Sequence, residues 1–305
     1  MAKTVIILNP VADRGRAARL APHIQSWLRA YPVADWAETS GPAHAIELAE
    51  RAARNGYERI VAAGGDGTVH EVVNGVLRAC EGRSDSVALG VIPIGSGNDF
   101  AWLAGAPLGN PQDAVRRVFE GRVRSVDAGI VRDERGVSAQ RYVANGIGIG
   151  FDAVVTIESR KIHRLRGFLM YVAAALRTIR FYYRATPARL DNDGHQIDLP
   201  LLMASIANGR RYGGGFYVCP EARLDDGHFD MCLVPQVSRA SMLAFIPRFM
   251  NGTHVRDPRV TMRRASTISV RCAEPMAVHA DGEIFSIGSR EIDAQILPGA
   301  LRVIV

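Results

Sequence analysis

The sequence predicts an α/β domain with a parallel sheet, followed by a β-rich, sandwich-like domain. The chain has 305 residues, which is more than one hydrophobic core usually serves. Up to about residue 125, short apolar runs alternate with helical patterns, and this alternation is typical of a parallel sheet covered on both faces. Glycine-punctuated apolar segments then follow at the spacing of an antiparallel sheet. We therefore predict domains of residues 1–127 and 128–305.

The elements of the first domain are predicted from apolar runs and their punctuation. The run Val5–Leu8 is a buried strand that stops at Asn9-Pro10, and Arg59–Ala63 is a second one that leads into Gly64-Gly65. A third strand, Val87–Ile94, precedes another glycine-rich loop. Helical spacing of apolar residues predicts three helices, over residues 16–29, 43–55 and 69–77.

The second domain is predicted from seven apolar segments and two helices. The segments are Val126–Val131, Gln140–Ile149, Arg189–Leu190, Leu201–Ala207, Phe229–Val234, Thr267–Val270 and Leu301–Val305. The helices are expected near Leu169–Tyr183 and Ser238–Asn251.

Composition indicates an ordinary globular protein of the cytoplasm. Hydrophobic residues make up 48% and charged residues 22% of the chain, and no apolar stretch is long enough to span a membrane. The first residues read as a strand and not as a signal peptide. The four cysteines are scattered without zinc spacing, which is typical of a reduced, cytosolic chain.

The positive charge has two readings. The net charge of +6 favours anionic partners but serves solubility equally well. No acidic residue occurs between Glu158 and Asp191. That segment also holds aromatic residues, so it could rest on an anionic membrane surface or simply pack as helices within the second domain. Its basic residues include Arg160, Lys161, Arg164, Arg166, Arg177, Arg180 and Arg184.

The string Gly64-Gly65-Asp66-Gly67-Thr68, between a strand and a helix, predicts a phosphate-binding loop. Glycines let the backbone approach phosphates, and a helix N-terminus offers N–H groups and a positive dipole end. Thr68 could cap the helix with Glu71 as its capping-box partner, or bond a phosphate oxygen. Asp66 is a candidate metal-binding or catalytic residue. The alternative is a tight turn without a ligand.

Polar loops also follow the other predicted strands of the first domain. Asn9-Pro10 with Gly15, the turn at Thr39, and Gly95–Asp99 each lie at such a position. Because ligands of open parallel sheets bind beyond the carboxyl ends of the strands, we expect these loops to meet at one crevice.

In the second half, Asp281-Gly282-Glu283 is the candidate catalytic string. Residues two apart on a strand share a face, so the two carboxylates could form a pair in which one pKa is raised, as suits a general base. The alternative is a hairpin turn with solvated acids. His279 is expected to be a packed or hydrogen-bonding neighbour. Asp225-Asp226-Gly227 reads locally as a turn.

Together these motifs resemble the diacylglycerol kinase catalytic domain, and more closely the bacterial diacylglycerol kinase and sphingosine kinase-like lipid kinases. The resemblance covers nearly the whole chain in order. It rests on Asn9-Pro10, Gly64–Thr68, Glu71–Gly75, Ile92–Phe100, Asn145–Asp152, Ala207–Gly209, Asp225–Gly227 and His279–Glu283. It implies the fold shared by NAD kinases and diacylglycerol kinases, with ATP and Mg²⁺ as cofactors and a lipid hydroxyl as phosphate acceptor.

The resemblance also implies roles for individual residues. Glu283 would accept the proton of the lipid hydroxyl, with Asp281 and Asp66 as further catalytic residues. A Mg²⁺ ion would be held by the Asp226 carboxylate and by backbone carbonyls at Arg223 and His228. The family usually has glycine where Asp13 stands and threonine where Ser96 stands. ATP contacts would come from Asn9, Pro10, Val11, Ala12, Asp13, Thr39, Gly64, Gly65, Asp66, Gly67, Thr68, Val69, His70, Glu71, Ser96, Asn98 and Asp99.

Alternatives to a lipid kinase are an NAD kinase-like phosphotransferase, because that family has a similar glycine-rich loop, and a non-catalytic nucleotide-binding regulator. The strings at residues 93–99 and 281–283 favour a lipid kinase. Nothing supports nucleic-acid binding, since no recognition motif accompanies the charge. The sequence identifies neither the lipid nor the oligomeric state, for which a homodimer is one alternative.

Overall fold

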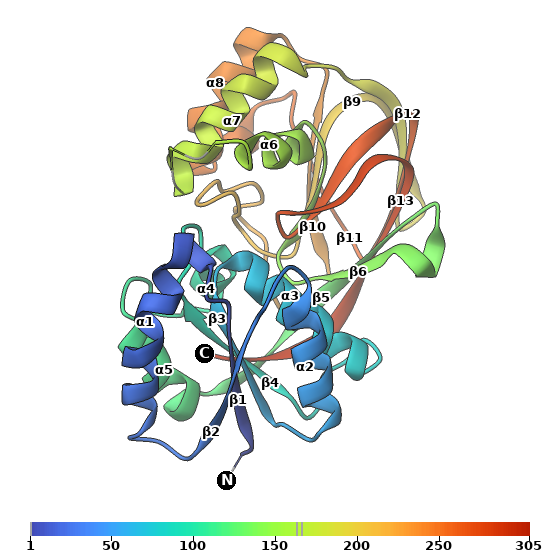
Figure 1. The fold of residues 1–305 in the computed structure, drawn as a ribbon. Coiled ribbons are helices and arrows are strands. Elements are labelled where there is room, and N and C mark those ends of the chain that lie inside the picture. The colour runs from blue at the N-terminus through green and yellow to red at the C-terminus, as the bar shows by residue number, and fades with distance from the viewer. Residues whose placement is uncertain (1, 163, 166) are drawn as a thin grey trace. The chain divides into compact units, whose positions relative to one another are not determined.

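The computed structural model describes residues 2–162, 164–165 and 167–305, so Arg166 of the basic segment lies outside the described residues. The chain divides into two compact units, and Figure 1 shows their elements. The first unit consists of residues 1–128 and 297–305, and the second consists of residues 129–296.

The first unit contains four strands that are joined in parallel. β1 (Thr4–Leu8) pairs with β2 (Ala34–Glu38) on one side and with β3 (Arg59–Gly64) on the other, and β3 pairs with β4 (Ala88–Pro93). The apolar runs that predicted β1 and β3 are almost completely buried.

Helices α1 and α5 cover one face of these strands and α2 and α3 the other (Figure 1). Residues alternate between the two faces, and Ile6 and Leu8 pack beneath α1 and α5. The helices are α1 (Ala12–Leu28), α2 (His44–Arg54), α3 (Asp66–Ala79), α4 (Asp99–Leu103) and α5 (Pro111–Glu120).

Two strands run through both units. β5 (Val123–Asp133) leaves the first unit after Ala128, and β13 (Glu283–Ile304) returns to it at Leu297. The last residues therefore belong to the first unit, whereas the sequence had predicted that they belong to the second. The physical reason is strand pairing: Arg302 and Val303 of β13 pair in parallel with Ala88 and Leu89 of β4.

The second unit is β-rich, as predicted, and its strands pair in antiparallel fashion. β7, β9, β10 and β11 follow one another, β8 joins β9 to β12, and β12 also pairs with β7 and β13. These strands are β6 (Gln140–Val143), β7 (Gly146–Gly150), β8 (Thr186–Asn192), β9 (His195–Ala207), β10 (Phe229–Pro235), β11 (Thr261–Ala265) and β12 (Thr267–Ala280).

Both helices predicted for the second unit are present, as α7 (Gly167–Phe181) and α8 (Arg239–Asn251). A further helix, α6 (Phe151–Ser159), was not predicted from the sequence. Short 3₁₀ helices occupy Gly136–Ala139 (η1) and Thr253–Arg256 (η2). Within the described part of the chain, no helix has the length and apolar character that crossing a membrane requires.

Candidate functional site

The glycine-rich loop between β3 and α3 is shaped by close contacts that exclude side chains. A Cβ on Gly64 would lie 2.3 Å from Thr68 Oγ1, and a Cβ on Gly65 would lie 3.1 Å from the Cα of Gly95. The helix starts at Asp66, three residues earlier than predicted, with Gly65 as its N-cap. The N–H groups of the first turn of a helix have no acceptor within the helix, so this turn presents donors and the positive end of the α3 dipole.

The loop after β1 is bonded to this glycine-rich loop. The Asn9 side chain donates from Nδ2 to Thr68 Oγ1 at 3.1 Å and accepts from Val11 N at 3.2 Å. The predicted capping box does not form, since Thr68 makes no side-chain cap and Gly65 is the N-cap residue. The two predicted loops nevertheless meet, through Asn9 and Thr68.

Asp66 is a half-buried carboxylate that anchors the start of α4. Its Oδ1 accepts the N–H of Phe100 at 3.1 Å. Burial, and then the neighbouring Asp99 carboxylate, raise the pKa of Asp66 to about 7, although backbone N–H groups of residues 98–100 lower it in part. In the structure this carboxylate holds the start of α4 through Phe100, and its role as a metal-binding or catalytic residue stays a prediction.

The loop after β4 is closed by the side chain of Asn98. Its Oδ1 accepts from Gly95 N at 2.9 Å and its Nδ2 donates to Gly95 O at 2.7 Å. Asn98 has φ = 55°, in the left-handed region that asparagine tolerates better than most residues. Ser96, at the tip of this loop, is exposed. Asn98 thus shapes the loop, and Ser96 is the side chain available to a ligand.

Glu71 joins α3 to the loop after β2. Its two carboxylate oxygens accept from Ala43 N at 2.9 Å and Ala45 N at 3.1 Å, so it caps the start of α2. Thr39 donates its backbone N–H to Leu8 O and is buried. The side chains of Val69 and His70 are also buried in α3, so an ATP contact at these residues would have to come from the backbone.

The loop after β1 contains three consecutive residues with positive φ. Asp13, Arg14 and Gly15 have φ values of 46°, 57° and 80°. Only glycine adopts this conformation without cost, and a non-glycine residue there costs roughly 1–2 kcal/mol. This backbone conformation suits glycine better than the aspartate at position 13. Pro10 and Ala12 flank this turn, and the regular part of α1 follows Gly15 as predicted.

In the second unit, Asp281-Gly282 is a two-residue hairpin turn between β12 and β13. Both residues have positive φ, 51° and 82°, and Ala280 pairs with Glu283 across the turn. The Asp281 carboxylate accepts N–H groups of Ala144, Asn145 and Gly146 at 2.8–2.9 Å. Asp281 therefore holds the start of β7 and does not form the predicted carboxylate pair with Glu283.

Glu283 has an arginine partner instead. Arg160 donates to Glu283 Oε2 at 2.6 Å and to Gly282 O at 3.2 Å. The Glu283 side chain is 44% exposed. Of the two carboxylates in this string, Glu283 is the one that solvent and a substrate can reach.

A buried polar network behind the turn was not identified from the sequence. His279 Nδ1 accepts from Gly282 N at 3.2 Å, and its Nε2 lies 3.5 Å from Asp152 Oδ1. Asp152 also accepts from Ser205 Oγ and the Tyr212 hydroxyl. Burial raises the pKa of Asp152, but His279 and the two hydroxyl donors outweigh this, and the pKa is lowered overall.

Gly148 makes room for this network. A Cβ on Gly148 would lie 2.3 Å from His279 Nε2 and 2.5 Å from Asp152 Oδ2. The glycine-rich string at residues 145–152 was therefore a usable signal, because it contains both this glycine and Asp152. The network supports the turn that carries Glu283, which agrees with the expected role of His279 as a hydrogen-bonding neighbour.

The predicted Mg²⁺ residues do not present an open ligand set. The Asp226 carboxylate accepts from Arg264 and from His228 N, and His228 Nδ1 lies 2.8 Å from the backbone oxygen of Asp226. Arg223 belongs to the same segment. Among the described residues there is no cluster of three or more acidic, histidine or cysteine side chains suited to a metal. This arrangement does not fit the predicted ion.

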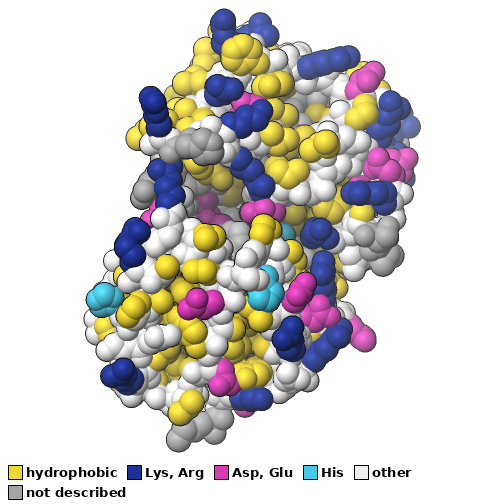
Figure 2. Space-filling view, viewed as in Figure 1, with side chains coloured by type: hydrophobic (Ala, Val, Ile, Leu, Met, Phe, Trp, Pro, Cys, Tyr) yellow, Lys and Arg dark blue, Asp and Glu magenta, His cyan; other side chains and the backbone are white. Residues whose placement is uncertain are grey.

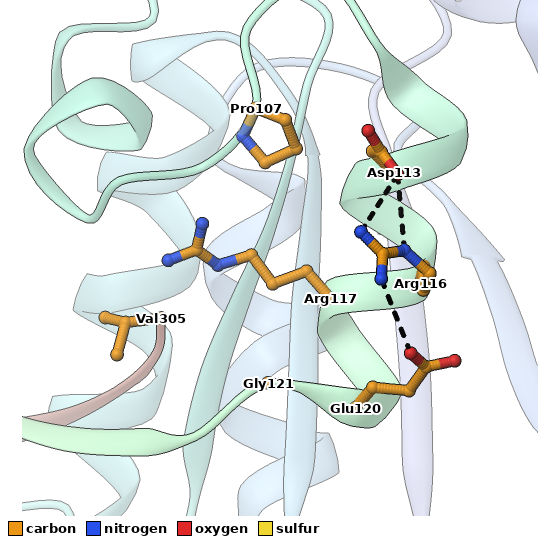
Figure 3. A pocket seen from close by; sticks show the side chains of 7 residues that line it. All are labelled: Pro107, Asp113, Arg116, Arg117, Glu120, Gly121 and Val305. Atoms are coloured by element: carbon orange, nitrogen blue, oxygen red, sulfur yellow. Dashed lines mark hydrogen bonds and ion pairs between the residues drawn. The ribbon is translucent and has the colours of Figure 1, made fainter.

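One hollow of the first unit contains none of the loop residues. It has a volume of about 420 Å³ and is lined by α5 and the last residue, Val305 (Figure 3). Arg116 pairs with Asp113 and Glu120, and Arg117 donates to Ala104 O and Gly105 O. Because these guanidinium groups already have partners, we do not treat this hollow as the functional site.

Two family descriptions match the chain. Residues 3–131 match the diacylglycerol kinase catalytic domain, and residues 145–305 match the YegS C-terminal NAD kinase beta sandwich-like domain. Among solved structures, a diacylglycerol kinase from Bacillus anthracis covers 99% of this chain and 96% of its own, with a TM-score of 0.73 and 21% identity. The match with yeast NADH kinase covers 100% of this chain and 83% of that kinase, with a TM-score of 0.58 and 12% identity. At these identities the two structures support the fold alone.

Curated relatives are similar over most of their length. A diacylglycerol kinase of Mycobacterium tuberculosis is 32% identical over 99% of this chain and 94% of its own. A probable lipid kinase, YegS-like, of Pseudomonas aeruginosa is 31% identical over 85% of this chain and 80% of its own. The chain therefore belongs to the family of diacylglycerol kinases and YegS-like lipid kinases.

Proposed function

We propose that this protein transfers the γ-phosphoryl group of ATP to the hydroxyl group of a lipid. The observation that carries the proposal is the first turn of α3, where the glycine contacts leave backbone donors and a positive dipole end for an anion. Mg²⁺ enters as the Mg·ATP complex and lowers the charge repulsion between the phosphates and the attacking oxygen.

The residues of the first unit bind and orient ATP. Backbone N–H groups at Asp66, Gly67 and Thr68 donate to phosphate oxygens, and the exposed hydroxyl of Ser96 is a further donor. Asp66 acts indirectly, by holding the start of α4 and with it the Gly95–Asn98 loop. The Asp13 side chain in the first loop is only 8% exposed and pairs with Arg16 at 3.7 Å, which offsets its negative charge.

Glu283 acts on the acceptor. The new bond joins the lipid oxygen to the γ-phosphorus, the bond from this phosphorus to the β,γ-bridging oxygen breaks, and ADP leaves. The hydroxyl proton passes to Glu283, which must first exchange its contact with Arg160 for one with the hydroxyl. Arg160 then becomes available as a cation for the transferred phosphoryl group.

A hollow that begins next to Glu283 in the sequence is lined by both apolar and polar side chains, and we propose that its apolar part contacts the lipid. It has a volume of about 470 Å³ and is lined in part by Ile284, Phe285 and Ile287 of β13 and by Asp133 and Arg135. Ile287 is 81% exposed, which is unusual for such a large aliphatic side chain.

The proposal includes a contact with an anionic membrane through α7 and α8. Apolar side chains are exposed at Leu169, Leu176 and Phe181 of α7 and at Leu243 and Met250 of α8. In Figure 2, hydrophobic and basic side chains are interleaved over the region of these helices. The basic residues that the structure describes there include Arg164, Arg177, Arg180 and Arg184. Apolar anchors beside cations are typical of peripheral membrane binding.

The direct test of the proposed reaction uses purified protein, Mg·ATP labelled at the γ-phosphate, and a panel of lipid alcohols with NAD as a competing acceptor. We expect label in the organic phase and a product whose mass exceeds that of one lipid by one phosphate group. If label appears only in NADP, the protein is an NAD kinase and not a lipid kinase. Nucleotide binding without transfer to any acceptor would favour a regulator.

The general base is tested with Glu283→Gln. The amide keeps the size of the side chain but cannot take the proton, so kcat should fall by about 10²- to 10⁴-fold with little change in ATP affinity. Glu291→Gln is the matched control, since Glu291 is also a glutamate of β13 with an arginine partner, Arg271 at 3.9 Å. A Glu283→Gln enzyme within about threefold of wild type would assign proton transfer to another group.

Asp66 predicts a pH dependence of stability in the first unit. In the unfolded chain an aspartate loses its proton near pH 4, whereas folded Asp66 retains it to about pH 7. The stability gained from the protonated form is therefore full below about pH 4 and is lost as pH rises to about 7. The asparagine of Asp66→Asn stays neutral. Between about pH 4 and 7 the free energy of unfolding of this variant should therefore fall by about 2–4 kcal/mol less than that of wild type.

Tryptophan fluorescence isolates this effect, because Trp27, Trp36 and Trp102 are the only tryptophans and all lie in the first unit. Urea unfolding followed by this signal at several pH values gives the comparison. Asp85→Asn, at an exposed carboxylate of the same unit, should behave as wild type does. Parallel pH profiles for wild type and Asp66→Asn would show that Asp66 is ionised throughout this range.

The membrane contact is tested by sedimentation with vesicles. Wild type should bind vesicles that contain anionic lipid more tightly than neutral ones, and salt should weaken this binding. Leu169→Ser combined with Leu176→Ser should reduce binding at least several-fold and leave ATP binding intact. Val33→Ser changes an apolar residue of the first unit that is 93% exposed, and it should have no effect. If all three proteins bind the anionic vesicles equally well, α7 does not contact the membrane.

A further inference from the structure

Arg264 of β11 lies between two carboxylates of the second unit. One of its terminal nitrogens contacts Asp226 Oδ2, and its Nε lies 3.8 Å from Asp230 Oδ2. The Asp226 side chain is 21% exposed and that of Asp230 is 10% exposed, so both carboxylates are partly withdrawn from water. Two acidic groups held this close to each other and to protein need a nearby positive charge.

The register of the strands places Arg264 there. β10 and β11 are antiparallel, and Asp230 is directly opposite Arg264, so their side chains share a face of the sheet. The preceding residue, Arg263, is opposite Met231 and therefore lies on the other face. The pairing of Arg264 with Asp230 is thus a consequence of backbone pairing, whereas Asp226 contacts Arg264 from the turn that precedes β10.

The turn that carries Asp226 is completed by internal hydrogen bonds. Asp226 Oδ1 accepts from His228 N at 3.2 Å, and Gly227 has φ = 72°. The other carboxylate oxygen faces Arg264. Both oxygens of the one charged ligand in the predicted Mg²⁺ site are therefore in use.

A Mg²⁺ ion at this carboxylate would lie beside the guanidinium group of Arg264. Two cations at this separation repel each other, and Mg²⁺ also requires several oxygen ligands in near-ideal octahedral geometry. We propose that Arg264 takes the place of a divalent cation in this chain, so that the turn at Asp225–Gly227 and the edge of the sheet are stable without Mg²⁺. The inference does not depend on the catalytic role proposed above.

The test measures unfolding of the second unit in the absence of nucleotide. Calorimetry is run with millimolar Mg²⁺ or with chelator, and tryptophan fluorescence identifies the transition of the first unit, which contains all three tryptophans. For wild type we expect the Tm of the second unit to change by less than about 1 °C between the two conditions. Arg263→Ala, on the other face of the same strand, should give the same result.

Arg264→Ala should differ in two ways. Its Tm in chelator should be lower by a few degrees, because two carboxylates have lost their counter-charge, and Mg²⁺ should raise it by at least about 2 °C. Adding Asp226→Asn to Arg264→Ala should abolish the response to Mg²⁺. An Arg264→Ala protein that ignores Mg²⁺ would contradict the proposal, since the acids would then not form a cation site even when the arginine is absent.

A second measurement does not depend on whether Arg264→Ala folds. Mn²⁺, used as a paramagnetic substitute for Mg²⁺, is titrated into nucleotide-free wild type and Asp226→Asn. We expect the concentration of free Mn²⁺ to be the same in the titrations of wild type and of Asp226→Asn. Binding of one Mn²⁺ by wild type that Asp226→Asn loses would overturn the inference and restore the metal site implied by the family resemblance.

Discussion

The hydrogen bond from the backbone of Phe100 to the half-buried carboxylate of Asp66 is the interaction on which the loops at the carboxyl ends of β3 and β4 depend. Asp66 is the first residue of α3, and Phe100 lies in the first turn of α4. The bond therefore fixes the loops after β3 and β4 against each other. It also allows Gly65 and Gly95 to approach within backbone contact, which no other residue type permits.

A common arrangement underlies both candidate sites. Asp66, Glu71 and Asp281 are all carboxylates that accept backbone N–H groups from a loop distant in sequence. Each satisfies donors that would otherwise be orphaned at the start of a helix or strand. The groups left for ligands are different ones: the N–H donors of α3, the hydroxyl of Ser96 and the exposed carboxylate of Glu283. Acidic residues near the sites thus stabilise the loops, and few of them face a substrate.

The difference between carboxylates that stabilise loops and groups that remain for ligands explains how much of the structure could be predicted from the sequence. Buried strands such as β1 and β3 were recognised because their apolar runs stop at glycine or proline. The motifs identified the loops and the family. Helix α6 was missed because Val154, Val155, Thr156 and Ile157 are β-branched residues that favour strands. The return of β13 to the first unit was missed because strand pairing with β4 leaves no local signal.

The partners of the charged side chains could not be predicted either, because these contacts also leave no local signal in the sequence. Asp66 and Phe100 are 34 residues apart, and Asp281 and Asn145 are 136 apart, so only the folded chain brings them together. The hairpin turn that was the alternative at Asp281 is present, and Asp226 also lies in a turn, as its local sequence predicted. Arg160, which the sequence placed in a basic segment, pairs with Glu283, and Arg264, which the sequence analysis did not single out, pairs with Asp226.

The central claim is that the first turn of α3 binds the phosphates of ATP through its backbone. It is tested most directly by following backbone amide resonances of ¹⁵N-labelled protein during titration with Mg·ATP. The account predicts that the largest shifts occur at Asp66, Gly67 and Thr68, and that adenosine, which has no phosphates, leaves these amides unchanged. Shifts that avoid this turn, or equal shifts with adenosine, would contradict the account.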